Sequence, residues 1–170
     1  FTPIRSVDRC IHSRKPHCAV RSAGQPFACK IGPMSKPNIT IGLIGYQFMG
    51  KAHSNAYRQA NRFFDLPRQI RMKTICGRNA AGVSAAAQKL GWEGYATDYH
   101  QVLADPEIDV IDIATPGDSH CEIALAAAKA GKAIWCEKPI GNTLDEATQM
   151  LDAVVKAGVH HAVFHNYRKA

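Results

Sequence analysis

Residues 39–50 read ITIGLIGYQFMG, and this stretch decides the fold of the chain. Its first seven residues form an apolar run without polar alternation, which is typical of a strand buried on both faces of a parallel sheet. Glycines follow at positions 45 and 50, and we expect a helix of about 15 residues from Phe48 to near Arg62. A buried strand, a glycine turn and a helix in this order predict the start of a parallel α/β fold.

The same alternation of strand and helix continues along the chain. Gly91, Gly131 and Gly158 are expected to end helices, and Thr143 with Glu146 forms a capping box. We predict strands over residues 70–76, 95–97, 110–114, 133–136 and 161–164, and helices over 79–90, after Asp98, over 119–130 and over 143–158. Right-handed crossovers then favour a doubly wound parallel sheet, a Rossmann fold of the α/β class, whose ligands bind beyond the carboxyl ends of the strands.

The first 37 residues have a different pattern, with no helical or strand period and frequent proline and glycine. We therefore expect a disordered basic tail over residues 1–37 and a Rossmann domain over 38–170. Two alternatives are an organelle transit peptide and a zinc site. The candidate zinc ligands are Cys10, His12, His17, Cys18 and Cys29. We favour a third interpretation, in which the natural protein starts at Met34 and residues 1–33 are upstream or non-native sequence.

The net charge of +7 over 170 residues belongs mostly to this tail. Residues 1–38 contain seven Lys or Arg and one Asp, whereas the remainder contains 14 basic and 13 acidic residues. A basic groove for nucleic acid on the folded domain is therefore not expected. No apolar stretch is long enough to span a bilayer, and six irregularly spaced cysteines do not suggest a disulfide scaffold. We expect a cytoplasmic protein with reduced thiols and no metal site.

The glycine turn resembles the G-x-G-x-x-G pattern that binds the diphosphate of a dinucleotide at a helix N-terminus. Gly45 and Gly50 match the first and third glycines, whereas Gln47 replaces the second. The candidate diphosphate-binding residues are therefore Gly45, Gln47, Phe48, Met49 and Gly50. The alternative is that these glycines only allow close packing of strand and helix.

The end of the second strand bears on the choice of cofactor. An acidic residue usually binds the adenosine ribose there, but this chain has Gly77 followed by Arg78. Without a carboxylate, Arg78 could pair with a 2′-phosphate, so we favour NADP over NAD. The alternative is that Arg78 is a solvated residue at the start of a helix.

Two further segments end at the same predicted edge of the sheet. After the fourth strand, Thr115 could bond to the nicotinamide-side ribose, Pro116 shapes the turn, and His120 faces the edge or is a surface residue. The alternative for Asp118 and Ser119 is that one of them simply caps the next helix. After the fifth strand, Lys138 beside Glu137 could donate a proton or hydrogen bond to a substrate oxygen, unless the two form an ordinary exposed pair.

Taken together, these segments resemble the glucose–fructose oxidoreductase, inositol 2-dehydrogenase and rhizopine-catabolism family, called Gfo/Idh/MocA. The most specific element is Glu137-Lys138-Pro139 at its spacing from the glycine turn. The others are the turn itself through Lys51-Ala52-His53, the segment Ala114-Thr115-Pro116 with His120, and Asn166-Tyr167-Arg168. The similarity covers about residues 38–170.

The resemblance implies an NAD(P)-dependent oxidoreductase that moves hydride between nicotinamide C4 and a carbon of a sugar, inositol or related polyol. It implies that Lys138 positions or polarises the substrate oxygen and that Glu137 borders the cofactor. It also implies that Asn166 and Arg168 lie beside the nicotinamide. Gln47 and Gly77 depart from the family pattern, at the diphosphate and at the adenosine ribose respectively.

The family also has a second α+β domain, which supplies further catalytic residues and oligomer contacts. We expect that domain to be absent from this chain, which would bind cofactor with negligible turnover. A homo-oligomer is expected only for a full-length form. The alternative function is a non-catalytic dinucleotide-binding sensor, which would have no need of Lys138 as a donor.

Overall fold

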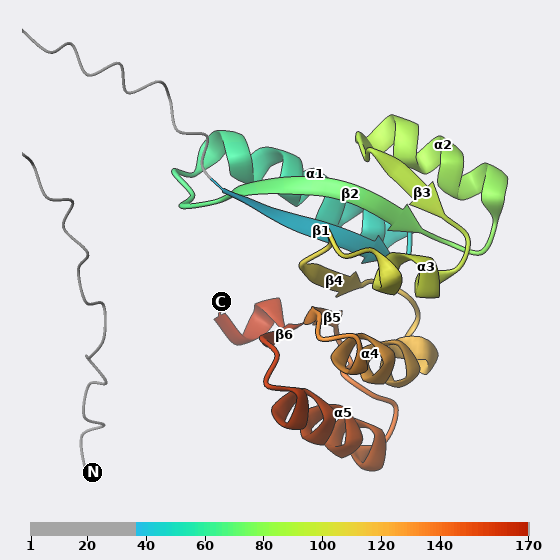
Figure 1. The fold of residues 1–170 in the computed structure, drawn as a ribbon, viewed down its shortest axis with the longest axis vertical. Coiled ribbons are helices and arrows are strands. Elements are labelled where there is room, and N and C mark those ends of the chain that lie inside the picture. Colours follow the sequence, from blue (N-terminus) through green and yellow to red (C-terminus); the bar gives the residue numbers. More distant parts are fainter. Residues whose placement is uncertain (1–36, 170) are drawn as a thin grey trace, which may run out of the picture. The chain divides into compact units, whose positions relative to one another are not determined.

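The computed structural model describes residues 37–169 (Figure 1). The predicted tail, with its candidate zinc ligands, lies outside these residues apart from Pro37.

Six parallel strands form one sheet in the order β3-β2-β1-β4-β5-β6. This order confirms the predicted doubly wound Rossmann topology, because the chain moves outward from β1 in one direction and then in the other. Each strand lies within one or two residues of its predicted position. The strands are β1 (Asn38–Ile44), β2 (Gln69–Cys76), β3 (Gly94–Ala96), β4 (Val110–Ile113), β5 (Ala133–Glu137) and β6 (His161–Phe164).

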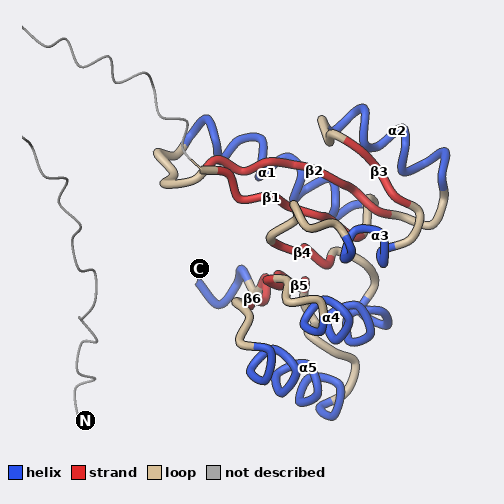
Figure 2. The backbone as a smooth tube through the Cα atoms, viewed as in Figure 1, coloured by secondary structure: helices blue, strands red, loops and turns tan. Residues whose placement is uncertain are grey.

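Helices cover both faces of this sheet, as Figure 2 shows. The helices α1 and α2 pack on one apolar cluster that includes Tyr57 and Val83, whereas α3, α4 and α5 pack on another that includes Leu103, Ile123 and Met150. These helices are α1 (Phe48–Phe63), α2 (Ala80–Leu90), α3 (Tyr99–Ala104), α4 (His120–Lys129) and α5 (Leu144–Ala157). Two short 3-10 turns complete the described part, η1 (Gly117–Ser119) and η2 (Asn166–Lys169).

The helices begin and end close to the predicted capping residues and glycines. Gly91 and Gly158 adopt the left-handed conformation just after α2 and α5, with φ of 79° and 66°. Three helices begin with a capping side chain that accepts a backbone N–H bond, namely Asn79 before α2, Asp98 before α3 and Thr143 before α5. Gln47, at the start of α1, forms no such bond. The N-terminus of the longest helix therefore keeps its first N–H groups free of a side-chain cap.

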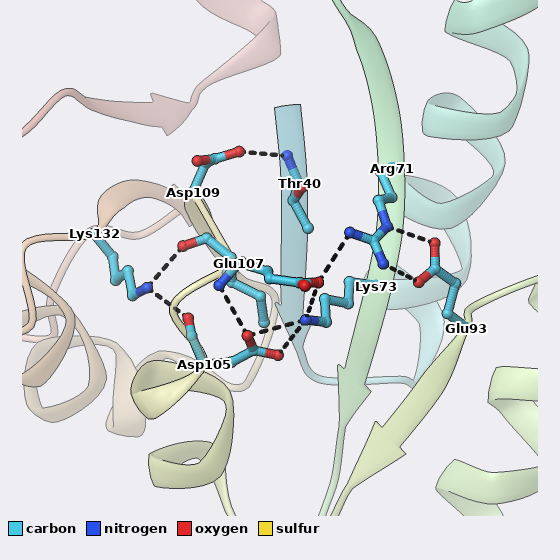
Figure 3. A network of polar contacts seen from close by, with 9 residues as sticks. Thr40, Arg71, Lys73, Glu93, Asp105, Glu107, Asp109 and Lys132 are labelled. Carbon is cyan, nitrogen blue, oxygen red and sulfur yellow. Dashed lines mark hydrogen bonds and ion pairs between the residues drawn. The ribbon is translucent and has the colours of Figure 1, made fainter. Parts of the chain in front are cut away.

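A network of ion pairs connects elements at the amino ends of the strands, opposite the carboxyl edge of the sheet (Figure 3). Lys73 on β2 pairs with Asp105 and Glu107 in the loop before β4, at 2.7 and 2.6 Å. Lys132, just before β5, donates to the backbone carbonyls of Asp105 and Ile108 at 2.7 and 2.8 Å. This edge is therefore occupied by structural contacts, and the site must be sought at the carboxyl edge.

Candidate functional site

The glycine turn leaves β1 and enters α1 at the carboxyl edge of the sheet. Gly45 has a φ of 110°, and a Cβ built there would lie 2.5 Å from the carbonyl oxygen of Ala114 on the β4 side. A Cβ at Gly50 would overlap the carbonyl oxygen of Gly45. Both glycines are therefore required by the close approach of backbone to backbone, which is how such a turn aims a helix N-terminus at an anion.

The uncapped start of α1 fits a dinucleotide diphosphate. Phe48 is exposed at the first helical position, and the side chain of Gln47 forms no capping bond. The N–H groups of this first turn, together with the positive end of a 16-residue helix, are therefore available to negatively charged oxygens.

The structure gives a steric reason for glycine at the end of β2. A Cβ at Gly77 would overlap two ring carbons of Tyr46, and a Cβ at Gly82 would lie 2.6 Å from the Tyr46 hydroxyl oxygen. The Tyr46 ring therefore occupies the space that a side chain at position 77 would need. Arg78 follows Gly77 and is exposed. Tyr46 was not among the predicted site residues, although it lies within the turn.

Thr115 and Pro116 follow β4 at the same edge. The Ser119 hydroxyl oxygen lies within hydrogen-bond distance of the Thr115 hydroxyl, at 2.7 Å, and of the Pro116 carbonyl oxygen, at 2.9 Å. Ser119 occupies the N-cap position of α4, as the alternative predicted, but its side chain forms no capping hydrogen bond to the helix. Its hydroxyl instead stabilises the turn that carries Thr115.

His120 is 1% exposed, so its interpretation as a surface residue is wrong. Its Nδ1 lies 2.8 Å from the carbonyl oxygen of Pro139, and its Nε2 lies 2.8 Å from the carbonyl oxygen of Thr115. The ring therefore ties the turn after β4 to the turn after β5. Both ring nitrogens are occupied in this way, so any role of His120 at a cofactor acts through the two turns that it holds.

Glu137 and Lys138 end β5 and differ sharply in their environments. Glu137 is 5% exposed, so the alternative of an ordinary exposed pair is wrong. Lys138 is exposed, and its backbone N–H donates to Glu137 Oε2 at 3.0 Å. The Lys138 side chain is thus free to reach a ligand, whereas the Glu137 carboxylate is turned into the protein.

The topology brings most of the predicted site residues to one edge. The strands β1, β4 and β5 are parallel neighbours, so Gly45, Thr115 and Lys138 lie at their shared carboxyl edge. Asn166 and Arg168 lie in η2 just after β6, the neighbour of β5, and both are exposed. The predicted nicotinamide end and the predicted diphosphate turn therefore share one rim of the sheet.

A buried polar network lies directly beneath this rim. His53 on α1 contacts two carboxylates, with its Nδ1 2.8 Å from Asp112 Oδ2 and its Nε2 3.1 Å from Glu137 Oε1. Tyr57, one turn further along α1, donates its hydroxyl to Asp112 Oδ2 at 2.6 Å. The ring of Phe164 on β6 packs against His53, with 4.5 Å between ring centroids. The network therefore connects α1, β4, β5 and β6.

The two carboxylates determine the charge of the imidazole. Burial lowers the pKa of His53, but hydrogen bonds and charge interactions with Asp112 and Glu137 outweigh it and raise the pKa above its ordinary value of 6.5. A neutral ring has one N–H, whereas an imidazolium donates to both carboxylates. The geometry therefore favours the protonated ring. Burial and the neighbouring Asp112 also raise the pKa of Tyr57, which keeps its hydroxyl a donor.

This charge state predicts a pH dependence of stability. The groups facing His53 are Asp112, Glu137, the Tyr57 hydroxyl and the Phe164 ring. Because the folded-state pKa lies above 6.5, the stabilisation is fully present below about pH 6.5 and is lost as the pH rises through the folded-state value. We expect the free energy of unfolding from urea titrations at pH 6 to 9 to fall more steeply for the unsubstituted chain than for His53→Gln. Parallel pH curves for the two proteins would contradict this.

Most of this network was not predicted, although the sequence contains two signals of it. Asp112 is a single acid within the otherwise apolar strand β4 and is fully buried. His53 and Tyr57 stand four residues apart, which places both on one face of α1. A buried acid opposite such a pair indicates a polar network.

The described residues, 37–169, also bear on metal binding, membrane insertion and thiol chemistry. Within this range no group of three or more His, Cys, Asp or Glu is placed to hold a metal ion, and no helix is long and apolar enough to cross a membrane. Burial, followed by the charge of nearby carboxylates, raises the pKa of Cys76 to about 11 and that of Cys136 to about 12. These two thiols therefore stay protonated near neutral pH and are poor nucleophiles.

Comparison with known proteins agrees with this geometry. Residues 39–165 match the model of the Gfo/Idh/MocA family, described as an oxidoreductase family with an NAD-binding Rossmann fold. The levoglucosan dehydrogenase of Pseudarthrobacter phenanthrenivorans is 45% identical over 133 residues, which are 78% of this chain and 34% of that protein. The chain thus spans about a third of the length of this relative.

Solved structures give the same result. An oxidoreductase domain protein from Kribbella flavida is 50% identical, with a TM-score of 0.75 over 78% of this chain and 36% of that one. A levoglucosan dehydrogenase in complex with NADH and levoglucosan is 45% identical, with a TM-score of 0.75 and the same coverage. The strand order, the glycine turn and these matches together show that the chain belongs to the Gfo/Idh/MocA oxidoreductase family, whose NAD-binding Rossmann domain it contains.

Proposed function

We propose that this chain is the cofactor-binding part of an NAD(H)-dependent dehydrogenase acting on a CH–OH group of a sugar or related polyol. The observation that carries the proposal is the uncapped N-terminus of α1 beside the Gly45 turn, with exposed Lys138 at the same edge of the sheet. A diphosphate over α1 directs the rest of a dinucleotide along this edge, across the end of β4.

We assign roles to these residues from their place at this edge of the sheet and from the resemblance to the family. NAD⁺, when bound, supplies the carbon that accepts a hydride from the carbinol carbon of the substrate. The Lys138 ammonium would donate a hydrogen bond to the substrate oxygen and stabilise negative charge there while the hydroxyl proton passes to solvent. Thr115 holds the adjoining ribose, and Asn166 and Arg168 border the nicotinamide end. The buried Glu137 carboxylate holds the Lys138 backbone in place by accepting its N–H.

We now favour NAD over NADP as the cofactor. The preference for NADP depended on the missing acid at position 77, but the Tyr46 ring accounts for that glycine on steric grounds. The solved complexes of the 45% identical relative contain NADH, and the comparisons lend no support to a preference for NADP. Arg78, exposed beside this position, is then assigned to the solvent-facing side of the adenosine ribose.

The substrate class rests on the relatives. One 45% identical relative is a levoglucosan dehydrogenase, and a 26% identical one is an inositol 2-dehydrogenase of Salmonella typhimurium. Both names denote oxidation of a cyclic polyol or sugar derivative. The alternative, a dinucleotide sensor without catalysis, leaves the exposed Lys138 at the nicotinamide end without a purpose.

Replacing Gln47 by aspartate tests the diphosphate site, because it is expected to move stability and binding in opposite directions. The new carboxylate can cap α1, which should raise the free energy of unfolding by about 0.5–1 kcal/mol. The same charge would repel the diphosphate and compete for its N–H groups, so the dissociation constant for NADH should rise by about tenfold or more. Thermal unfolding and calorimetric titration measure the two effects.

The control is Gln88→Glu, which adds the same charge at an exposed position in the last turn of α2, at the far edge of the sheet. It should leave NADH affinity within about twofold of the unsubstituted chain. An undiminished affinity in Gln47→Asp would place the diphosphate elsewhere.

A further inference from the structure

His53 is a buried side chain, held between two carboxylates, for which the proposed reaction has no direct use. It lies beneath the rim, and its two ring nitrogens are both taken up by carboxylates, Asp112 at 2.8 Å and Glu137 at 3.1 Å. An imidazolium between two carboxylates is costly to bury, since each group loses its hydration.

Each of the two carboxylate oxygens of Glu137 contacts a different group. Oε1 faces His53 Nε2, and Oε2 accepts the backbone N–H of Lys138 at 3.0 Å. Both oxygens are thus held by partners on the inner side of the rim. The carboxylate is thereby kept away from the ammonium of its own neighbour, Lys138, which forms no ion pair with the residues that the structure describes.

Without a positive charge on His53, Glu137 would lose one of its two partners. Glu137 would be a buried carboxylate with a single N–H partner, and the nearest way to regain a cationic partner would be to turn outward to Lys138. A Glu137–Lys138 ion pair would neutralise the ammonium that the proposed function requires at the substrate oxygen.

We propose that His53 is a positioning residue that holds the Glu137 carboxylate inward and so keeps the Lys138 ammonium free at the nicotinamide end of the site. This inference rests on the proposed function, because it names the group that makes Lys138 available. His53 touches neither substrate nor cofactor in this account. It acts only through Glu137.

The test uses the relative affinity of the chain for NAD⁺ and NADH. The nicotinamide ring of NAD⁺ is positively charged, whereas that of NADH is neutral, so a free Lys138 ammonium weakens NAD⁺ binding selectively. The dissociation constant for NAD⁺ divided by that for NADH therefore reports the Lys138 charge. Structural changes that weaken the binding of both nucleotides equally leave this ratio unchanged. Calorimetric titrations of the chain with each nucleotide give this ratio.

The variants form a double-mutant cycle. Lys138→Met should lower the ratio by about fivefold, as for two charges roughly 7 Å apart in a partly solvated site. His53→Gln should lower it by a similar factor, because Glu137 then neutralises Lys138. The double variant should have the same ratio as Lys138→Met alone. If the lost His53 charge instead acted directly on the nicotinamide ring, its effect on the ratio would add to the effect of Lys138→Met.

Tyr57→Phe is the structural control. It removes the hydrogen bond to Asp112 and leaves the contact between His53 and Glu137 in place, so it should reduce stability without changing the ratio. An unchanged ratio in His53→Gln, or additive effects in the cycle, would overturn the inference while leaving the proposed function intact. If neither nucleotide binds the unsubstituted chain, both the proposed function and this inference fail.

A second measurement needs no variant. Nitrogen-15 spectra of the histidine rings in the unliganded chain should show two protonated nitrogens for His53 at neutral pH. A neutral ring, with one unprotonated nitrogen, would overturn the inference even if His53→Gln did not fold.

Discussion

Replacing Asp112 by alanine is expected to lower the free energy of unfolding by about 3 kcal/mol, the scale on which a broken buried pair destabilises a domain. Asp112 is fully buried, and its Oδ2 accepts from the Tyr57 hydroxyl at 2.6 Å and contacts His53 Nδ1 at 2.8 Å. Its loss leaves two buried donors without an acceptor. It also leaves a gap beneath the rim of the site.

Urea unfolding of Asp112→Ala beside Asp118→Ala measures this effect. Asp118 is an exposed acid in the turn that follows the same strand, so its replacement should change stability by less than about 0.5 kcal/mol. A loss in Asp112→Ala as small as that of the control would show that the network contributes nothing to folding.

Replacing Gly50 by alanine is expected to damage both the turn and the cofactor site. The added Cβ would overlap the carbonyl oxygen of Gly45, which is backbone and cannot rotate away. The turn must therefore shift. We expect a stability loss of about 2–4 kcal/mol and a rise in the NADH dissociation constant of about thirtyfold or more, since the helix N-terminus moves with the turn.

The matched control for this substitution is Gly94→Ala in β3. A Cβ there would meet only the Lys73 carbonyl oxygen, at an ordinary distance of 3.8 Å, so both stability and binding should be preserved. Calorimetric titration with NADH and urea unfolding compare the two variants. Equal NADH affinities for the two would contradict the assigned role of the turn.

The fold was predictable from the sequence because its signals are local. The run from Ile39 to Ile44 is apolar on both faces, and Gly91 and Gly158 stop helices in the left-handed conformation that favours glycine. The parallel topology then places the residues after β1, β4 and β5 at one edge. The positions of Gly45, Thr115 and Lys138 at a shared rim followed from these rules.

The remaining features of the site depend on contacts between distant residues, which local patterns do not specify. His53 meets Asp112 across 59 positions and Glu137 across 84. The Tyr46 ring fills the space above Gly77 from a different loop, so the missing acid was interpreted as a cofactor preference. His120 was left open between an edge and a surface residue, because only the fold brings the Thr115 and Pro139 carbonyls to its two nitrogens.

The most direct test of the account is a titration of the ¹⁵N-labelled chain with NADH, followed by amide resonances. We expect saturable binding, with the largest shifts in residues 47–50 at the start of α1 and further shifts at Thr115 and Lys138, and weaker binding of NADPH. Binding that shifts only amides at the opposite edge, around Lys73 and Lys132, would contradict the account. So would the absence of any binding at millimolar concentrations.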